Sequence, residues 1–389
     1  MKMNIAKVES VCLAEGAFGE VSLHRNTDNG TKTAHPFVVI KSIRNAYTWS
    51  TVQEDAEAMP QLQLRRTAQQ EVSILQSLTR EMDNSQHSSI VPLIRVEYGN
   101  TDTLSPMLKL IMPYCPIDLA FLLHNHVLRK PCQFATGLEV SYIRRFAKDI
   151  LSAVEFCHGN NIIHGDIKPS NFMLSQQGVL QLTDFGLAKW IGNMELETDQ
   201  PPAGICTLHY RPPELLFGVT NYGCEIDLFS AGLVLTELYN LCPLLPGNTC
   251  LDQAALMISK LGTPKNDTTT SAWPDYNKVL KFEPTEPLAM TALVPRCLYD
   301  ELFGKLVAAM LSMDPLERPT AKQCLEHSWF LASSGIASRL EIIRHCIPPC
   351  RRLPLLIASD TLQSIGKAWS CESNKLKSNI GDLTAVFSA

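Results

Sequence analysis

The sequence lacks a run of apolar residues long enough to cross a bilayer, and its first nine residues contain no apolar signal core. It also lacks an excess of basic charge, because 34 lysines and arginines face 39 aspartates and glutamates, for a net charge of −5. Without a basic field, we expect neither nucleic acid nor a membrane as a partner. The expected location is the nucleus or the cytoplasm, as a soluble protein.

The cysteines lack the spacing of a metal or redox motif. Thirteen are present, none form a Cys-x-x-Cys pair, and the neighbouring Cys346 and Cys350 have no matching His/Cys cluster after them. Reduced thiols are therefore the expected state. Internal repeats and low-complexity tracts are also missing. The 389 residues, of which 45% are apolar and 19% are charged, suffice for a two-lobed globular enzyme.

Residue periodicity predicts a β-rich first part and a mainly helical second part. Short β-rich segments occur at 8–13, 21–24 and 37–43, and an amphipathic helix is expected at 67–78. The polar stretch 44–66 is interpreted as a loop insertion. Together these patterns predict an α+β fold.

A glycine-containing turn between the first two predicted strands is a candidate phosphate-binding loop. Its residues are Ala14, Glu15, Gly16, Ala17, Phe18, Gly19, Glu20 and Val21. Glycines let the backbone approach phosphate oxygens closely and offer bare N–H groups to them. An ordinary β-hairpin has the same pattern, so the turn alone does not decide between the two interpretations.

Lys41 ends the next predicted strand, Val-Val-Ile-Lys, and is a candidate for gripping the α- and β-phosphates of ATP. Glu71, on the predicted amphipathic helix, is its candidate ion-pair partner. The alternative is that both are solvent-facing side chains. The glycine-containing turn just before Lys41 favours the phosphate-binding interpretation.

Two closely spaced motifs predict phosphoryl transfer. The first, His-Gly-Asp-Ile-Lys-Pro-Ser-Asn at 164–171, places Asp166 to accept the proton of a substrate hydroxyl and Lys168 to reach the γ-phosphate. The second is Asp184-Phe185-Gly186. Asn171 and Asp184 supply the oxygen ligands that Mg²⁺ prefers. Chance co-occurrence at this spacing is very improbable, so the sequence predicts an ATP- and Mg²⁺-dependent phosphotransferase.

The segment 207–218, together with 245–247 and 261–264, resembles the signature and the insert of the cyclin-dependent Ser/Thr protein kinases. Residues 273–278 are similar to the members that activate other cyclin-dependent kinases. The resemblance covers about residues 5–330, and its motifs are specific for protein kinases.

This resemblance implies a bilobal protein kinase fold. Residues 1–112 would form a small β-rich N-lobe with one regulatory helix, and residues 113–330 a larger, mainly helical C-lobe that carries the insert. Residues 331–389 would be a C-terminal extension outside the catalytic core. Glu214 and Arg318 would form a buried ion pair that anchors the activation segment.

The resemblance also implies how ATP is held. Met112 would lie at the back of the adenine pocket, while the Pro113 carbonyl and the Cys115 N–H would bind the adenine edge. Proline suits the first position because only its carbonyl is needed. The remaining residues would contact the ribose or sandwich the base. They are Asp118 for the ribose, Leu13 and Val21 above the base, and Leu174 below it.

The chain departs from the family where its members are switched on. The threonine that is normally phosphorylated in the activation loop corresponds to Pro202. The three basic residues that normally grip the phosphate correspond to Gln70, Gly165 and Lys189. The acceptor and two of its three cationic partners are therefore missing together. We interpret this as removal of the phosphate switch.

The predicted function is a Ser/Thr kinase of the cyclin-dependent type that activates other cyclin-dependent kinases or regulates the cell cycle or transcription, independently of phosphorylation of its own activation loop. A general proline-directed kinase and a pseudokinase scaffold are the alternatives. The missing phosphate acceptor favours an activating kinase, Arg211 weakly favours the proline-directed one, and a complete catalytic set argues against the scaffold. That set is Lys41, Glu71, Asp166, Lys168, Asn171 and Asp184. The expected partner is a protein substrate, and the sequence does not decide whether a cyclin is required.

Overall fold

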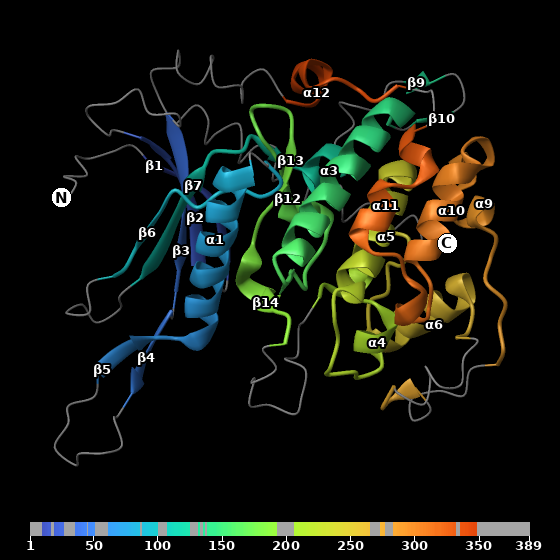
Figure 1. Ribbon diagram of the computed structural model, residues 1–389, viewed down its shortest axis with the longest axis horizontal. Coiled ribbons are helices and arrows are strands. Elements are labelled where there is room, and N and C mark those ends of the chain that lie inside the picture. The colour runs from blue at the N-terminus through green and yellow to red at the C-terminus, as the bar shows by residue number, and fades with distance from the viewer. Residues whose placement is uncertain are drawn as a thin grey trace. The chain divides into compact units, whose positions relative to one another are not determined.

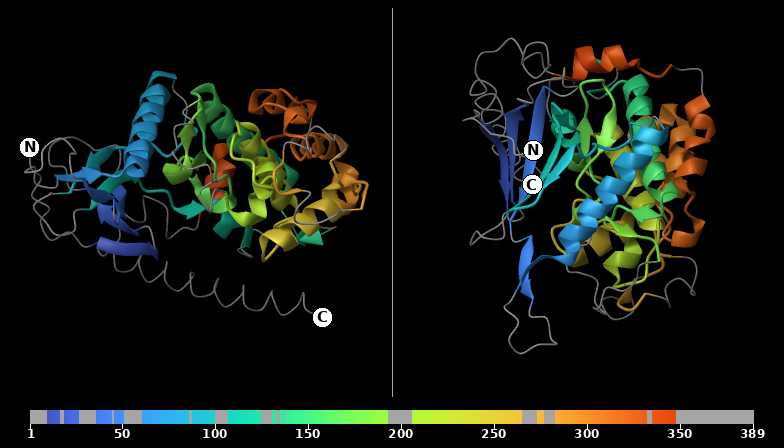
Figure 2. Two further views of the ribbon diagram at one scale, coloured as in Figure 1. Left: turned by 90° about the horizontal axis from the view of Figure 1, so that it is seen from below. Right: turned by 60° about the vertical axis from the view of Figure 1, so that its left-hand side comes forward.

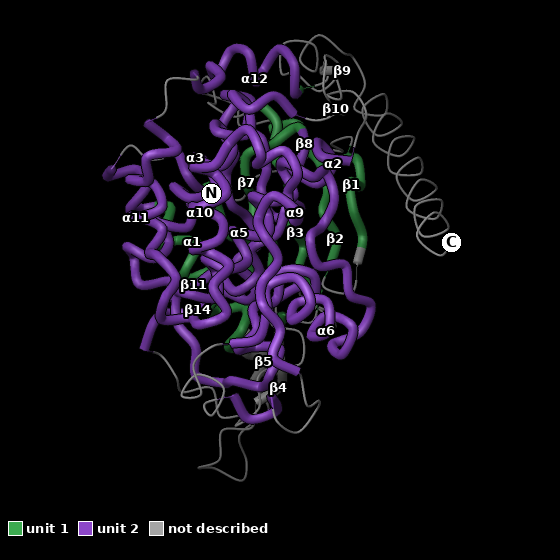
Figure 3. Tube along the Cα trace, turned by 90° about the vertical axis from the view of Figure 1, so that its right-hand side faces the viewer, with its two compact units in different colours: residues 1–79, 91–116, 347–389 green, residues 80–90, 117–346 purple. Residues whose placement is uncertain are grey.

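A computed structural model describes the protein at 10–16, 19–26, 36–44, 46–50, 61–85, 88–99, 107–124, 131–132, 135–136, 138–192, 206–264, 273–276, 283–331 and 335–347. Figure 3 shows two compact units. Unit 1 comprises 1–79, 91–116 and 347–389, and unit 2 comprises 80–90 and 117–346. The lobe boundaries expected from the sequence stay predictions. Among the described helices, none is long and apolar enough to cross a membrane.

Unit 1 is built on a five-stranded antiparallel sheet in the order β1-β2-β3-β7-β6 (Figure 1). Its strands are β1 (Ser10–Gly16), β2 (Gly19–Arg25), β3 (Phe37–Ile43), β6 (Arg95–Glu97) and β7 (Leu108–Pro113). The buried side chains of Leu23, Phe37 and Tyr114 form an apolar cluster on this sheet. Burial in β2 and β3 follows short apolar runs and not a strict alternation, with Leu23 in β2 and Phe37 and Val38 in β3 buried.

Helix α1 (Arg66–Ser85) follows the sheet's third strand, and its apolar residues are spaced as expected. Val72, Leu75 and Leu78 are all buried. The stretch interpreted as a loop insertion contains a two-stranded hairpin instead, formed by β4 (Tyr47–Ser50) and β5 (Gln61–Leu64). The Arg65 N–H donates to the Ala46 carbonyl at 2.7 Å, which closes the base of this hairpin directly before α1.

Unit 2 is mainly helical, as its sequence pattern predicted. Its helices are α2 (Leu119–His124), α3 (Val140–Gly159), α4 (Pro213–Leu216), α5 (Glu225–Asn240), α6 (Cys250–Leu261), α9 (Met290–Leu293), α10 (Glu301–Met310), α11 (Ala321–Leu325) and α12 (Arg339–Cys346). Its strands are β8 (Ile117–Asp118), β9 (Pro131–Cys132), β10 (Ala135–Thr136), β11 (Ile162–Ile163), β12 (Phe172–Leu174), β13 (Leu180–Leu182) and β14 (Lys189–Trp190). The five-stranded sheet of unit 1 and the helices of unit 2 confirm the α+β class.

Helix α5 forms the centre of unit 2, because residues on all of its sides are buried. Helices α3 and α10 both pack against α5, and α11 packs against α3 (Figure 2). A helix that is apolar all round is stable only when other elements cover it on every side. The loops at the N-terminal end of α5 are consequently held by a rigid core, and the candidate site lies there.

Candidate active site

The candidate residues of unit 1 centre on an ion pair between strand and helix. Lys41 lies on β3, and its Nζ is 2.8 Å from Oε1 of Glu71 on α1. The Glu71 side chain is only 8% exposed. A buried carboxylate is costly unless it is paired, so Glu71 is not an ordinary solvated residue. The buried pair therefore excludes the interpretation of Lys41 and Glu71 as two solvent-facing side chains, and phosphate binding by Lys41 stays a prediction.

The glycine-containing turn joins β1 to β2. Gly16 and Gly19 are opposite each other, and Ala14 lies opposite Val21. Gly19 has φ +149°, and a Cβ there would come within 1.9 Å of the Ser42 carbonyl oxygen. Only glycine fits this close approach. Glu15 and Glu20 are paired across the same two strands, while Ala17 and Phe18 lie outside the described residues.

The residues expected to bind adenine lie at the end of β7 and just after it. Met112 is buried and pairs with Val39 of β3, and Pro113 is the last residue of the strand. Cys115 is buried, and burial raises the pKa of its thiol to about 12, so it stays protonated at neutral pH. Leu13 is partly buried against the apolar cluster of unit 1.

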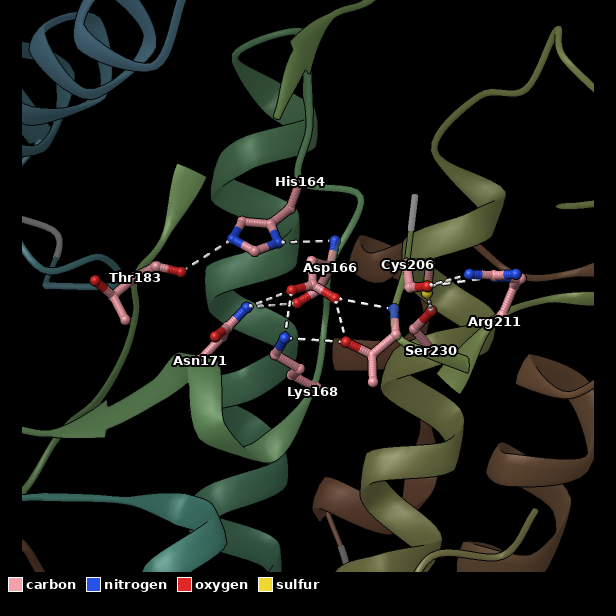
Figure 4. A network of polar contacts seen from close by, with 9 residues as sticks. His164, Asp166, Lys168, Asn171, Thr183, Cys206, Arg211 and Ser230 are labelled. Carbon is pink, nitrogen blue, oxygen red and sulfur yellow. Dashed lines mark hydrogen bonds and ion pairs between the residues drawn. The ribbon is translucent and has the colours of Figure 1, made fainter. Parts of the chain in front are cut away.

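The candidate residues of unit 2 converge on one carboxylate (Figure 4). Oδ2 of Asp166 is 2.6 Å from Nζ of Lys168 and accepts a hydrogen bond from Nδ2 of Asn171 at 3.1 Å. The same amide of Asn171 also donates to the Asp166 backbone carbonyl at 2.8 Å. Asp166 is buried at 7% exposure. The three residues predicted from the first phosphoryl-transfer motif are therefore brought together.

Thr207 completes this cluster from another part of the chain. Its N–H and its hydroxyl both donate to Oδ1 of Asp166, at 3.0 and 2.8 Å. Lys168 in turn donates to the Thr207 hydroxyl at 2.9 Å. Four donors thus surround the two oxygens of one carboxylate and fix its orientation. Thr207 belongs to the segment that resembles the family signature, but no local pattern in the sequence predicts these contacts.

The backbone around Asp166 is held by a second buried carboxylate, Asp227, in the first turn of α5. Asp227 accepts hydrogen bonds from the N–H groups of His164 and Gly165, at 2.8 and 2.9 Å, and lies 3.0 Å from Nε2 of His158. Burial alone would raise the pKa of Asp227, but the hydrogen bond and charge of His158, together with the contacts of His164, outweigh burial and lower it. The loop that carries Asp166 is consequently fastened to the most rigid helix.

Asp184 has the features of a metal ligand. It is exposed, and its backbone is left-handed at φ 64°, a strained conformation that is typical of functional sites. Phe185 after it is fully buried against the His164 ring, and Thr183 before it donates to the Asn171 carbonyl at 2.9 Å. Asp184 and Asn171 are thus on adjoining segments. Within the described residues, no group of three or more His, Cys, Asp or Glu side chains could hold a metal. Mg²⁺ is usually bound by one or two protein oxygen ligands together with phosphate oxygens, so the oxygens of Asn171 and Asp184 suit this metal.

The other residues expected in this unit have mainly architectural contacts. Asp118 caps α2 through a bond from the Phe121 N–H at 2.7 Å, and Leu174 on β12 is fully buried. Glu214 and Arg318 form the expected buried pair, with two bonds of 2.7 and 2.8 Å. A fork of this kind is strong and specific in geometry.

Of the four switch positions, Gln70, Gly165 and Lys189 are described, and Pro202 lies outside the described residues. Gln70 lies on α1, and Gly165 has φ +77°. A substituted Cβ at Gly165 would meet the Leu187 carbonyl oxygen at 3.2 Å. The left-handed backbone disfavours any side chain at this position, arginine included.

Cys206, directly before Thr207, was missed by sequence reasoning. It is a buried non-glycine residue with φ +61°. Its carbonyl accepts two bonds from the Arg211 guanidinium, from Nη2 at 2.9 Å and Nε at 3.3 Å. No side-chain pattern predicts such a backbone conformation, because cysteine rarely adopts it. The arginine was visible in the sequence, but its acceptor was not.

Three comparisons bear on this geometry. Residues 8–330 match the protein kinase domain family. Cyclin-dependent kinase 1 of Encephalitozoon cuniculi (strain GB-M1) is 29% identical over 332 residues, which cover 85% of this chain and 97% of that protein. A chain in the structure of the CAK complex of Chaetomium thermophilum bound to ATP-γ-S has a TM-score of 0.64 and 28% identity, covering 85% of this chain and 93% of that chain.

Proposed function

Since the chain belongs to the protein kinase family and to its cyclin-dependent-like branch, we propose that it transfers the γ-phosphate of ATP to Ser or Thr hydroxyls of a protein substrate. The observation that carries this proposal is the convergence of Lys168, Asn171 and Thr207 on the carboxylate of Asp166. Asp166 is the base that receives the hydroxyl proton, since phosphoryl transfer depends mainly on alignment and charge neutralisation.

The contacts of Asp166 indicate how its carboxylate becomes accessible to the substrate hydroxyl. The four donors on its two oxygens occupy the lone pairs of the carboxylate, so an incoming hydroxyl has to replace one of them. Thr207 and Asn171 are short side chains, whereas Lys168 has a flexible stem and a side chain that is 24% exposed. Lys168 has the longest side chain of these donors, so we expect it to be the one that the hydroxyl displaces, and its ammonium would then face the transferred phosphoryl group.

Mg²⁺ and ATP are proposed ligands of the same residues. Asn171 and Asp184 would hold the metal, which neutralises phosphate charge when bound. In unit 1, Lys41 would grip the α- and β-phosphates in the orientation that Glu71 imposes on it. The glycine-containing turn would offer its N–H groups, and the Pro113 carbonyl and Cys115 N–H would bind adenine.

We propose further that activity does not depend on phosphorylation of the chain's own activation loop. Pro202 has no hydroxyl, and neither Gln70 nor Gly165 can donate charge-assisted bonds to a phosphate. The proposed substrates are other cyclin-dependent kinases. This rests on the likeness to the CAK, or CDK-activating kinase, complex and on the resemblance of 273–278. Whether a cyclin binds is part of the test.

A second candidate, a proline-directed kinase, is favoured by the carbonyl of Cys206. The segment that begins at Cys206 adjoins Asp166 through Thr207, so we expect it to lie beside the substrate residue that follows the phosphorylated one. The Cys206 carbonyl already accepts a hydrogen bond from Arg211. It is therefore not available to the backbone N–H of the substrate residue after the phosphorylated one. Proline has no N–H to leave unpaired.

A radiolabel assay of the purified chain separates these candidates. Without any cyclin, it is given Mg-ATP and one of three substrates: a catalytically inactive cyclin-dependent kinase, a Ser-Pro peptide or the matched Ser-Ala peptide. Selective labelling of the kinase on its activation-loop threonine supports the activating role. Labelling of Ser-Pro over Ser-Ala, with loss of that preference in Arg211→Ala, supports the proline-directed role. No transfer to any substrate, with or without a cyclin, refutes the kinase proposal, and Asp166→Asn is the background control.

A further inference from the structure

Lys189 is the only basic residue among the three positions expected to grip a loop phosphate, and it has a different partner. Its Nζ lies 3.3 Å from the centroid of the Tyr222 ring. Lys189 is half-buried, as is Tyr222. An ammonium over an aromatic face is attracted by the ring quadrupole, more strongly when water is excluded. This contact therefore joins two segments that are 33 positions apart in sequence.

The two ends of this contact are attached to functional parts of unit 2. On one side, Lys189 belongs to β14, which pairs with β11, and it lies opposite Ile163. Strand β11 leads directly into the loop that carries Asp166, and β14 leads into the activation segment. On the other side, Tyr222 precedes α5, whose Asp227 holds the backbone N–H groups of His164 and Gly165.

The charges around Lys189 favour its cationic form at this place, although burial opposes it. Burial lowers the pKa of Lys189, and the carboxylates of Glu225 and Asp227, both in the first turn of α5, act in the opposite direction. Burial also raises the pKa of Tyr222 to about 12, and the negative charge of the nearby Asp227 acts in the same direction. The phenol therefore stays neutral at physiological pH, and its ring remains the partner of the cation.

We propose that Lys189 and Tyr222 are a positioning pair that fixes the start of the activation segment to α5, in the role that a loop phosphate has in related kinases. The inference rests on the proposed phosphorylation-independent activity, and it names the contact that makes this independence feasible. The pair touches neither the reacting atoms nor ATP. The pair acts on the segment that receives the protein substrate. It does so by fixing the direction of the chain where β14, which is paired with β11, ends and the activation segment continues.

The pair makes a specific prediction about which part of each side chain matters. Lys189→Met keeps the length of the side chain and removes its charge, and Lys189→Arg keeps the charge. Tyr222→Leu removes the aromatic face, and Tyr222→Phe keeps the face and removes only the hydroxyl. We expect Lys189→Met and Tyr222→Leu each to raise the KM for the protein substrate about tenfold. The KM values of Lys189→Arg and Tyr222→Phe should stay within about twofold of the wild type.

Steady-state kinetics with separately varied protein substrate and ATP test the proposal. The KM for ATP should be unchanged in all four variants. Loss of folded protein lowers the apparent kcat but leaves both KM values unchanged, so a raised KM for the protein substrate alone reports the effect of the pair. The double variant Lys189→Met/Tyr222→Leu should be no worse than either single one, because both remove one interaction. Should Tyr222→Leu fail to fold, Lys189→Met against Lys189→Arg decides the question at a half-exposed site.

Three outcomes would overturn the pairing: an unchanged protein-substrate KM in Lys189→Met, a defect in Tyr222→Phe as large as in Tyr222→Leu, or additive effects in the double variant. A failure of the underlying proposal looks different. In that case the wild-type protein itself is inactive or loses its activity on phosphatase treatment. If only the proposed role of the pair is wrong, the wild type stays active after phosphatase treatment, and the variants have the same KM for the protein substrate as the wild type.

Discussion

At the scale of single residues, the contacts of Asp166 predict what its replacement does. Asp166→Asn keeps the shape of the side chain but removes the base and introduces an N–H where donors already converge. We expect turnover to fall by at least about a thousandfold, while ATP affinity stays within about threefold, because the base acts on the acceptor hydroxyl. Single-turnover kinetics and calorimetric ATP titration measure the two quantities.

The matched control for this prediction is Asp184→Asn, which removes a metal ligand instead of the base. It should raise the Mg²⁺ concentration required for half-maximal activity and weaken nucleotide binding. If Asp166→Asn lost ATP affinity in parallel with Asp184→Asn, or retained turnover, the role of base would have to be assigned to another group.

At the scale of elements, a buried pair joins the last turn of α3 to the first turn of α5. Burial is the largest single influence on the pKa of His158 and lowers it, but the hydrogen bonds and charges of Asp227 and Cys224 together outweigh burial and raise that pKa to about 9, above the ordinary value of 6.5. The folded state therefore favours the charged imidazole. Its contribution to stability is fully present below about pH 6.5 and is lost as the pH rises through about 9.

Urea unfolding between pH 6.5 and 9.5 measures this contribution. Relative to His158→Gln, a neutral donor of similar reach, the wild type should lose on the order of 3 kcal/mol of unfolding free energy across this range. Comparison with the variant removes the effect of the other groups that titrate. Parallel pH curves for the two proteins would show that the pair does not stabilise the α3–α5 contact through its charge.

Helix α12 gives the described part of the C-terminal extension a structural role. Arg339 donates two bonds to Asp149 on α3 and a third, at 2.9 Å, to the Gly178 carbonyl in the β12–β13 turn. Asp149 is 5% exposed as a side chain and accepts one further bond, from the Leu180 N–H at 3.1 Å. Removing the guanidinium would leave a buried carboxylate poorly compensated.

Arg339→Ala should therefore destabilise unit 2 by about 1–3 kcal/mol, without changing kcat per folded molecule. The partly exposed position of Arg339, at 35%, keeps this below the cost of breaking a fully buried pair. Leu340→Ala, on the same helix with a 64% exposed side chain, is the matched control and should have little effect. Equal unfolding midpoints for the two variants would place α12 outside the cooperative core.

At the scale of the whole molecule, the sequence predicted what depends on side-chain type and spacing. Strand β3 has the predicted limits of 37–43, because a continuous apolar run between polar segments predicts a packed strand. The hairpin of β4 and β5 was missed because each strand has only four residues, although Tyr47 and Trp49 in β4 and Leu62 and Leu64 in β5 alternate with polar residues. The roles of Cys206 and Asp227 were missed for a different reason. They depend on backbone conformation and on contacts between segments far apart in sequence, which no local pattern encodes.

At this scale, the activity of the protein should not depend on phosphorylation of its activation loop. In related kinases a loop phosphate is an electrostatic clamp that orders the segment receiving the substrate. Here Pro202 replaces the acceptor, and Lys189 already stacks on Tyr222. Protein made in bacteria, treated with phosphatase and given no cyclin, should therefore remain active. Thr198, the remaining hydroxyl near this position, should also tolerate Thr198→Ala with little change in rate.

Rates before and after phosphatase treatment measure this, with mass spectrometry to confirm that the loop is unmodified. A kinase that does need its loop phosphate, treated in parallel, is the control for phosphatase action and should lose its activity. The deciding value is a tenfold fall in rate after phosphatase treatment, which corresponds to about 1.4 kcal/mol of activation free energy. A larger fall would show that a phosphate still orders the segment, in which case Lys189 would have to exchange Tyr222 for the phosphate, and the two contacts would compete for one ammonium.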